Sequence, residues 1–124
     1  MQRPLLSSCK DLIQKSDHKN SKNDKYYMAG NYYVYITTNP GKTVLYTGIT
    51  HDLTSRIMQH YNERGSKRTF TGKYYCYNLI YYEYFTDVKQ AIFREKEIKN
   101  MTRKKKEALI NSKNPNWNSI HVIK

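Results

Sequence analysis

Two predicted helices carry charged side chains at positions where chemistry would need them. In residues 87–100, DVKQAIFREKEIKN, helical periodicity builds one apolar face from Val88, Ala91, Ile92 and Ile98. Glu95 falls within that face, whereas Glu97 points away from it. A buried carboxylate is costly unless it is paired or binds a metal. Lys99, one turn later, offers an ion pair. Mg²⁺ offers the other solution, because it needs only one or two protein ligands when a phosphate supplies the rest.

The helix predicted over residues 52–62 has Leu53, Ile57 and Tyr61 as its apolar stripe. Arg56 and His60 lie four residues apart and border this stripe on one side, at the rim where a cleft would open. Arginine is suited to recognising phosphate through two parallel hydrogen bonds. The alternatives are a surface ion pair for Arg56 and a packing role at the edge of the core for His60. Together the two indicate a polar site more strongly than either does alone.

Residues 32–50, YYVYITTNPGKTVLYTGIT, predict a β-hairpin with tyrosines where strands usually carry aliphatic residues. If Thr37 pairs with Val44, Tyr35 lies opposite Tyr46, and Gly48 follows two residues further along the same face. The opposite face is aliphatic and typical of a core, with Val34, Ile36, Leu45 and Ile49. The phenol face is then the floor of a site, where Gly48 leaves room for a phosphate or for Arg56. The alternative is a cross-strand tyrosine pair that only stabilises the sheet.

The chain is strongly basic and rich in tyrosine. It has 22 Lys and Arg against 10 Asp and Glu, a formal charge of +12, and 13 tyrosines among 124 residues. This balance favours a polyanionic partner, with a solubilising surface as the alternative. Tyrosines interleaved with basic residues fit nucleic acid better than membrane. The candidate contacts to a phosphate backbone lie in a loop and in the first turn of a helix: Lys67, Arg68, Lys73, Lys104, Lys105 and Lys106.

The pattern along the chain predicts a mixed α/β fold in the order ββαβαα, with a three-stranded antiparallel sheet flanked by helices. Strands are expected over residues 32–37, 44–49 and 77–85, and helices over 52–62, 87–100 and 102–112. Residues 38–42, TNPGK, form the turn of the hairpin, and residues 63–75 form a basic loop.

The ends of the chain differ from its centre. Residues 1–30 are polar around SDHKNSKNDK and are expected to be a flexible extension, residues 31–120 the domain, and residues 121–124 a tail. Neither a signal peptide nor a membrane span is recognisable, so a soluble cytoplasmic protein is expected. Cys9 and Cys76 show no metal-ligand spacing, and Cys76 reads as a small buried hydrophobic residue.

Over about residues 31–120, the order and spacing of these residues resemble the GIY-YIG nuclease family. The resemblance is to its small single-domain bacterial members and to the N-terminal domain of a DNA-repair excinuclease. The segment 33–35, YVY, occupies the place of the first motif, and the segment 46–48, YTG, that of the second. Tyr33 and Val34 stand where the name-giving motif has Gly-Ile, and Thr47 stands where it has Ile. Both motif tyrosines and the glycine are kept.

The other candidate residues match the family one by one. Arg56 and His60 match the arginine and histidine of the following helix, and Glu95 matches the metal-binding glutamate. In NPNWNSI, residues 114–120, Asn118 matches an asparagine of the repair excinuclease.

The resemblance implies a Mg²⁺- or Mn²⁺-dependent hydrolysis of DNA phosphodiester bonds, with RNA left open as a substrate. Glu95 would hold the metal, Arg56 would stabilise the transition state, and Gly48 and Asn118 would support the site. Tyr35 or Tyr46 would orient the attacking water and pass its proton on, with His60. Which of the two tyrosines acts as the base is left open at this point.

Three functions are compatible with the sequence. The first is a metal-dependent endonuclease, selective for DNA structure and linked to repair or recombination. The second is a non-catalytic DNA- or RNA-binding module of the same fold. The third is an interaction subunit that takes its specificity from a protein partner, since no second domain is recognisable. The oligomeric state is not predicted.

Overall fold

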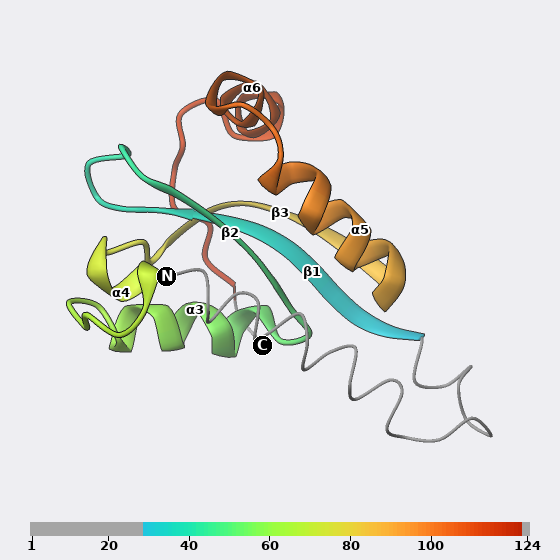
Figure 1. Cartoon of the computed structure of the whole chain (residues 1–124), viewed down its shortest axis with the longest axis horizontal. Coiled ribbons are helices and arrows are strands. Elements are labelled where there is room, and N and C mark those ends of the chain that lie inside the picture. Colours follow the sequence, from blue (N-terminus) through green and yellow to red (C-terminus); the bar gives the residue numbers. More distant parts are fainter. Residues whose placement is uncertain (1–28, 123–124) are drawn as a thin grey trace.

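A computed structural model describes residues 29–122 of the chain. Three strands, β1 (Ala29–Thr38), β2 (Leu45–Thr50) and β3 (Asn78–Asp87), form one antiparallel sheet in the order β2-β1-β3. β1 is therefore the central strand, and both of its neighbours run against it (Figure 1). The predicted fold class, a three-stranded antiparallel sheet flanked by helices, is confirmed.

Within the described part of the chain, four helices surround the sheet: α3 (Leu53–Asn62), α4 (Phe70–Lys73), α5 (Val88–Lys99) and α6 (Arg103–Lys113). Each begins at a side chain that accepts a hydrogen bond from the first turn, as a stable helix start requires. The capping residues are Asp52, Thr69, Asp87 and Thr102. The one-turn helix α4 lies within the segment that was expected to be a loop. It begins at Thr69, whose hydroxyl accepts a hydrogen bond from the backbone N–H of Gly72 at 2.9 Å.

The two faces of the sheet have different partners (Figure 1). One face packs against α5 and α6 through aliphatic side chains, with Val34, Ile36, Ile49, Ile80, Ile98 and Ile110 fully buried. The other face packs against α3 and α4 and is rich in tyrosine, around Tyr35, Tyr46, Leu53, Cys76 and Leu79. The alternation predicted for the hairpin therefore holds, and Cys76 is fully buried as expected.

The loop between β1 and β2 sets a register different from the predicted one. The Asn39 side-chain oxygen accepts hydrogen bonds from the backbone N–H groups of Thr43, at 2.8 Å, and Val44, at 2.9 Å. These bonds place the loop at residues 39–44, one residue further along the chain than the predicted register does, so that Thr38 pairs with Leu45. Tyr35 consequently lies opposite Gly48 and not opposite Tyr46. The prediction of a Tyr35–Tyr46 cross-strand pair was wrong by two residues, although both phenols do share one face.

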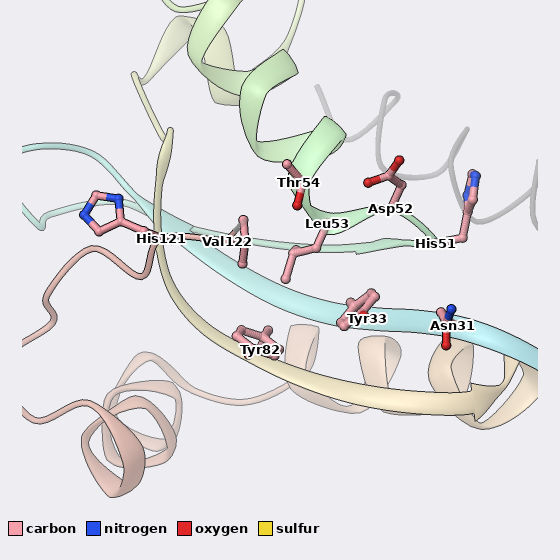
Figure 2. A pocket seen from close by; sticks show the side chains of 9 residues that line it. All are labelled: Asn31, Tyr33, His51, Asp52, Leu53, Thr54, Tyr82, His121 and Val122. Atoms are coloured by element: carbon pink, nitrogen blue, oxygen red, sulfur yellow. The ribbon is translucent and has the colours of Figure 1, made fainter. Parts of the chain in front are cut away.

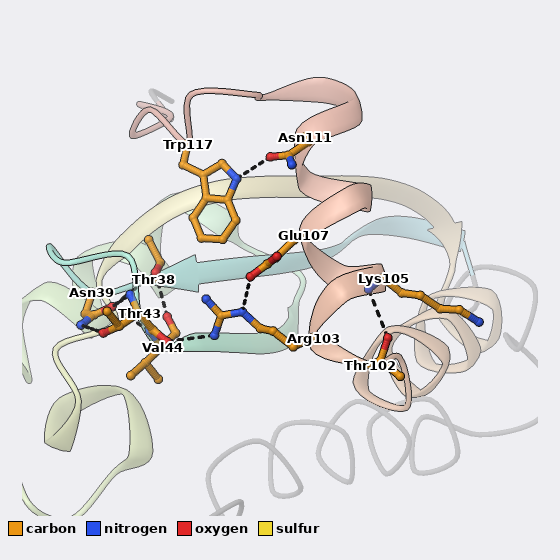
Figure 3. Close-up of polar contacts among 10 residues, drawn as sticks. All are labelled: Thr38, Asn39, Thr43, Val44, Thr102, Arg103, Lys105, Glu107, Asn111 and Trp117. Atoms are coloured by element: carbon orange, nitrogen blue, oxygen red, sulfur yellow. Dashed lines mark hydrogen bonds and ion pairs between the residues drawn. The ribbon is translucent and has the colours of Figure 1, made fainter.

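Helix α6 is tied to this loop and to the segment that follows it (Figure 3). The Arg103 guanidinium donates to the backbone carbonyl of Thr43 at 2.8 Å and to the Glu107 carboxylate at 2.9 Å. The Trp117 indole N–H donates to the Asn111 side chain at 2.7 Å. The start and the end of α6 are thereby held against distant parts of the chain.

Beyond α6 the chain runs along β3 toward the tyrosine-rich face. The Asn114 side-chain amide donates to the carbonyls of Ile80 and Asn118, both at 2.9 Å, and the backbone N–H of Ile120 donates to Leu79 at 2.7 Å. Ile120 and Val122 then pack against the tyrosine-rich core. Val122 thus packs although residues 121–124 were expected to be a tail.

The predicted strands and helices all exist, and β1 extends at least to Ala29 at its start. The expected extension, residues 1–30, lies outside the described residues except for its last two. Within residues 29–122, no helix combines the length and apolarity needed to cross a bilayer.

Gly48 is required by the ring of Tyr35. A Cβ atom at Gly48 would lie 2.5 Å from both the Cζ and the hydroxyl of Tyr35, far inside van der Waals contact. The space predicted to admit a phosphate or Arg56 is therefore filled by the phenol. This overturns that interpretation of Gly48.

We expect Gly48→Ala to lower the free energy of unfolding by about 1–3 kcal/mol, because overpacking forces the ring of Tyr35 aside. Gly41→Ala is the matched control, since its Cβ would meet nothing closer than 3.8 Å. Urea denaturation of both variants measures the difference. Equal stability of the two variants would contradict the proposed clash.

Candidate active site

A buried chain of hydrogen bonds joins the first-motif tyrosine to a helix and to the turn beyond it. The Tyr35 hydroxyl lies 2.8 Å from Nε2 of His60, and the Thr71 hydroxyl lies 3.1 Å from Nδ1 of the same ring. Tyr35 is fully buried, and His60 and Thr71 are 6% and 3% exposed. Both ring nitrogens are therefore engaged, and the histidine predicted from α3 is joined directly to β1.

Tyr46, the tyrosine of the second motif, packs around this chain through its ring. The ring lies edge-on to the imidazole of His60 at 5.6 Å between centroids, and 6.3 Å from the ring of Tyr35. It also stacks on the ring of Phe70, with 5.8 Å between the centroids. The two motif tyrosines and His60 thus form one buried aromatic cluster on the face that α3 and α4 cover.

His60 is held neutral at physiological pH. Burial, and next the positive charge of Arg56 on the preceding turn, lower its pKa from 6.5 to about 4. A neutral imidazole accepts one hydrogen bond and donates another. Tyr35 can therefore donate to Nε2 while Nδ1–H donates to Thr71, or both bonds reverse in the other tautomer. In the first arrangement the phenol proton of Tyr35 points at a basic nitrogen.

Arg56 and Glu95 lie on helices that cover opposite faces of the sheet, so only Arg56 is on the face that carries Tyr35 and His60. Arg56 lies on α3 and is half-buried. Glu95 lies on α5 and is 1% exposed, with a carboxylate oxygen 3.3 Å from Nζ of Lys99. The ion pair weighed as the alternative for Glu95 is therefore present. Next to it, Arg94 binds both carboxylate oxygens of Glu83 at 2.9 Å, which fixes α5 on β3.

The described residues fit one kind of metal site and not another. Between residues 29 and 122, no three side chains of His, Cys, Asp or Glu gather closely enough to hold an ion. A dedicated all-protein site does not fit. A single carboxylate on hard oxygen ligands does fit Mg²⁺ or Mn²⁺ shared with a phosphate, the usual arrangement for nucleotide chemistry. Glu95 is the candidate ligand for such an ion, and the ion would have to replace the Lys99 ammonium beside the carboxylate.

The predicted basic contacts fall into two groups on different sides of the sheet. Lys67, Arg68 and Lys73 are exposed on and before α4, and Lys104 and Lys105 are exposed in the first turn of α6 (Figure 1). Lys106 is half-buried. Burial, and then the charges of Arg103 and Lys99, lower its pKa. A cationic corner therefore lies at the junction of α5 and α6, where Lys99 pairs with Glu95.

Asn118 is the asparagine that the resemblance expects to support the site. It is exposed, and its backbone N–H and carbonyl bond to the side chain of Asn114 at 3.1 and 2.9 Å. Asn114 has the structural role in this segment. Two other residues escaped the sequence reasoning, Thr71 and Phe70, because α4 is too short to leave a periodic pattern. The Thr69 cap before them was the available signal.

Comparisons with known proteins place this chain in a family. The GIY-YIG catalytic domain matches residues 31–108. A UPF0213 protein of Clostridium perfringens is 41% identical over 81 residues, which cover 65% of this chain and 84% of that protein. A UPF0213 protein of Natronomonas pharaonis is 36% identical over 83 residues, 67% of this chain and 94% of that one. The solution NMR structure of a UPF0213 protein from Bacillus halodurans is 30% identical, with a TM-score of 0.45, over 72% of this chain and 92% of that one.

A three-stranded antiparallel sheet that carries two motif tyrosines, with an arginine and a histidine on the next helix, defines a class of nuclease domain. This chain belongs to that class, the GIY-YIG family. GIY-YIG domains are of the endonuclease type, act on DNA and generally use divalent metal ions. The relatives described above bear the name UPF0213, a group of small proteins within that family.

The buried His60 predicts a pH dependence of stability. Its pKa is about 4 in the folded chain and 6.5 in the unfolded chain. Below about pH 6.5 the unfolded chain therefore gains a proton that the folded chain does not. The contribution is complete above pH 6.5 and is lost as the pH falls toward 4, for a loss of about 2–3 kcal/mol by pH 4.5.

Urea denaturation at pH 7 and pH 4.5 measures this loss. We expect His60→Gln to lose less stability than the parent chain between the two pH values. His121→Gln, which removes an exposed imidazole, controls for the loss of a histidine as such. An equal acid sensitivity in all three proteins would exclude His60 as the titrating group.

Proposed function

We propose that this chain is a metal-dependent endonuclease that hydrolyses phosphodiester bonds in DNA, selective for DNA structure and active in repair or recombination. The observation that carries the proposal is the bond between the Tyr35 hydroxyl and a neutral, buried His60, in a chain that belongs to the GIY-YIG family. A phenol beside a neutral imidazole has a route by which a proton can move, which a tyrosine that only packs does not need.

Each residue of the site has a distinct role in this proposal. Arg56, half-buried on α3, pairs with the scissile phosphate and stabilises the charge that develops there. Tyr35 orients the attacking water, and His60 accepts a proton through the phenol. Tyr46 supports the ring of His60 from the side. Glu95 would hold Mg²⁺ or Mn²⁺, which supplies positive charge to the phosphate and the leaving oxygen.

Substrate binding would make His60 a better base. Burial is the larger cause of its low pKa, and the charge of Arg56 is the second. A phosphodiester paired with Arg56 cancels that second cause, so the pKa of His60 rises when the substrate is in place. The histidine would thus remain neutral in the free protein and gain basicity only in the complex.

A specific observation favours the second function, a non-catalytic nucleic-acid-binding module. Tyr35 is fully buried, Glu95 is 1% exposed, and Glu95 is already paired with Lys99. A catalytic Glu95 must exchange that ammonium for a metal, whereas a binding module could keep the pair as a structural feature. A cleavage assay therefore distinguishes the nuclease from the binding module.

Cleavage of branched, nicked, single-stranded and duplex DNA with Mg²⁺ or Mn²⁺ separates the two functions. We expect EDTA to abolish cleavage, and Glu95→Gln to slow it roughly a hundred-fold or more, since several kcal/mol of charge stabilisation correspond to at least that factor. Glu97→Gln is the control, because its carboxylate is on the same helix and is 50% exposed.

The outcomes are distinct. Cleavage that survives in Glu95→Gln would refute the role of Glu95, and DNA binding without cleavage on every substrate would favour the binding module. Because Glu95→Gln leaves Lys99 without its carboxylate, its thermal stability must be measured beside its activity. Arg56→Lys supplies a second variant, which keeps the charge and removes the two-pronged contact with phosphate.

The first turn of α6 predicts a salt dependence of DNA binding. Lys104 and Lys105 are exposed and lie at the end of a helix whose dipole attracts phosphate. If both contact the DNA backbone, the double alanine variant reduces the slope of log affinity against log salt by about 1–2. Lys89 and Lys96 on α5 are also exposed, and their double alanine variant removes the same charge as a control. An equal change in both variants would mean a general charge effect.

A further inference from the structure

A pocket of about 480 Å³ lies on the tyrosine-rich face of the sheet, and its lining includes neither Tyr35 nor His60. Tyr33 of β1 and Tyr82 of β3 form its sheet side, and Leu53 at the start of α3 faces them (Figure 2). His51 lies at one end and His121 at the other (Figure 2). The volume falls in the range of sites for small organic ligands.

The floor of this pocket is aromatic and accessible. Tyr33 and Tyr82 are both half-buried, with ring centroids 6.0 Å apart in an edge-on arrangement. Tyr84, 50% exposed, extends the row at 5.4 Å from Tyr33. Tyr35 and Tyr46, by contrast, are sealed in the core. Half-buried aromatic side chains on an open sheet face offer a platform on which a flat ring can stack.

The polar part of the lining suits the edge of a nucleobase better than a phosphate. The Asp52 carboxylate, which accepts from the backbone N–H and the hydroxyl of Ser55, lines the pocket and would repel an anion. Asn31, His51 and Thr54 add groups that can donate or accept hydrogen bonds. Bases present donors and acceptors of that kind along their edges.

The position of the pocket connects it to the proposed site. Tyr33 precedes Tyr35 by two residues on the same face of β1, a distance of about 7 Å along the strand. Arg56 lies one turn of α3 beyond Asp52. A base stacked on Tyr33 would therefore bring the phosphate that follows it toward Arg56. The formal charge of +12 favours a polyanionic ligand for the chain as a whole.

We propose that this pocket binds one unpaired nucleobase of the DNA substrate, stacked on Tyr33 and Tyr82. A base within a duplex is covered on both faces by its neighbours, so only an unpaired or extruded base can offer a face to these rings. The inference rests on the proposed function for its nucleic-acid substrate. It adds that the substrate carries an unpaired nucleotide beside the bond that is cut.

The test compares DNA affinities of the parent chain and its variants in EDTA, so that cleavage does not alter the DNA during the measurement. Fluorescence anisotropy compares a duplex with a single bulged thymidine, the same duplex with an abasic bulge, and the fully paired duplex. We expect the chain to prefer the bulged base over the abasic bulge by roughly 5- to 100-fold, the range of one base–aromatic stack. Tyr33→Leu should abolish that preference and leave affinity for the paired duplex unchanged.

Phe93→Leu is the matched control, since Phe93 is 70% exposed on α5, across the sheet from the pocket, and should keep the preference. Equal affinity for the bulged base and the abasic bulge, or a preference that persists in Tyr33→Leu, would overturn the proposal. If Tyr33→Leu does not fold, His51→Ala decides, because its side chain is exposed. A fall in the preference supports the subsite, and an unchanged preference overturns it.

Cleavage of the bulged duplex with Mg²⁺ is measured separately and tests the proposed function by itself. A preference for the bulged base without cleavage would leave the subsite in place and refute the nuclease. Cleavage without any such preference would do the reverse.

Discussion

The close approach of Tyr35 to Gly48 is the constraint on which the candidate site depends. The register of the hairpin places the phenol over the one residue in β2 that has no side chain, and a Cβ there would lie 2.5 Å from the ring. The ring of Tyr35 can therefore approach β2 closely, and its hydroxyl lies 2.8 Å from Nε2 of His60. Helix α3, which carries His60, and α4, which carries Thr71, are then joined to the central strand by one buried chain of hydrogen bonds. Gly48 weakens the strand locally, but its missing side chain leaves the space in which Tyr35 can bond to His60.

Burial fixes the geometry of this chain of hydrogen bonds and also makes an unpaired polar group in it costly. A phenol, an imidazole and a hydroxyl without contact with water must satisfy one another, and here they do. The same burial holds His60 neutral, so the site carries no charge of its own at the phenol, and Arg56 at the rim carries the positive charge. On the opposite face, Glu95 is a buried charge compensated by Lys99 within its own helix. A substrate phosphate that pairs with Arg56 would change the charge beside His60. A metal bound to Glu95 would displace Lys99. Substrate binding and chemistry would then be coupled.

The tyrosines divide into two populations that a count of 13 does not distinguish. Tyr35 and Tyr46 are buried and are shaped by their neighbours. Tyr33, Tyr82 and Tyr84 lie in a row along the same sheet face but remain accessible. The first group suits proton movement and the second suits stacking. Tyr33 and Tyr35 are two residues apart on β1, so the proposed surface for an unpaired base would lie beside the proposed site for a phosphate. A small domain would thereby have two ways to recognise a distorted DNA strand.

The sequence by itself determined the three strands and the helices α3, α5 and α6, the aliphatic and phenolic faces of the hairpin, and the positions of Arg56, His60 and Glu95 on their helices. These depend on periodicity and local chemistry, which a linear pattern carries. Only the folded structure decided the register, because the Asn39 side chain closes a loop that lies one residue further along the chain, which moves the partner of Tyr35 from Tyr46 to Gly48. It also decided the bond from Thr71 to His60, the ion pair chosen by Glu95, and the role of Asn114 in place of Asn118. The bond from Thr71 to His60 and the bond from Asn114 to Ile80 join groups that local spacing does not place together. The spacing of Glu95 and Lys99 allowed an ion pair, but burial of the carboxylate in the folded chain decided that it forms.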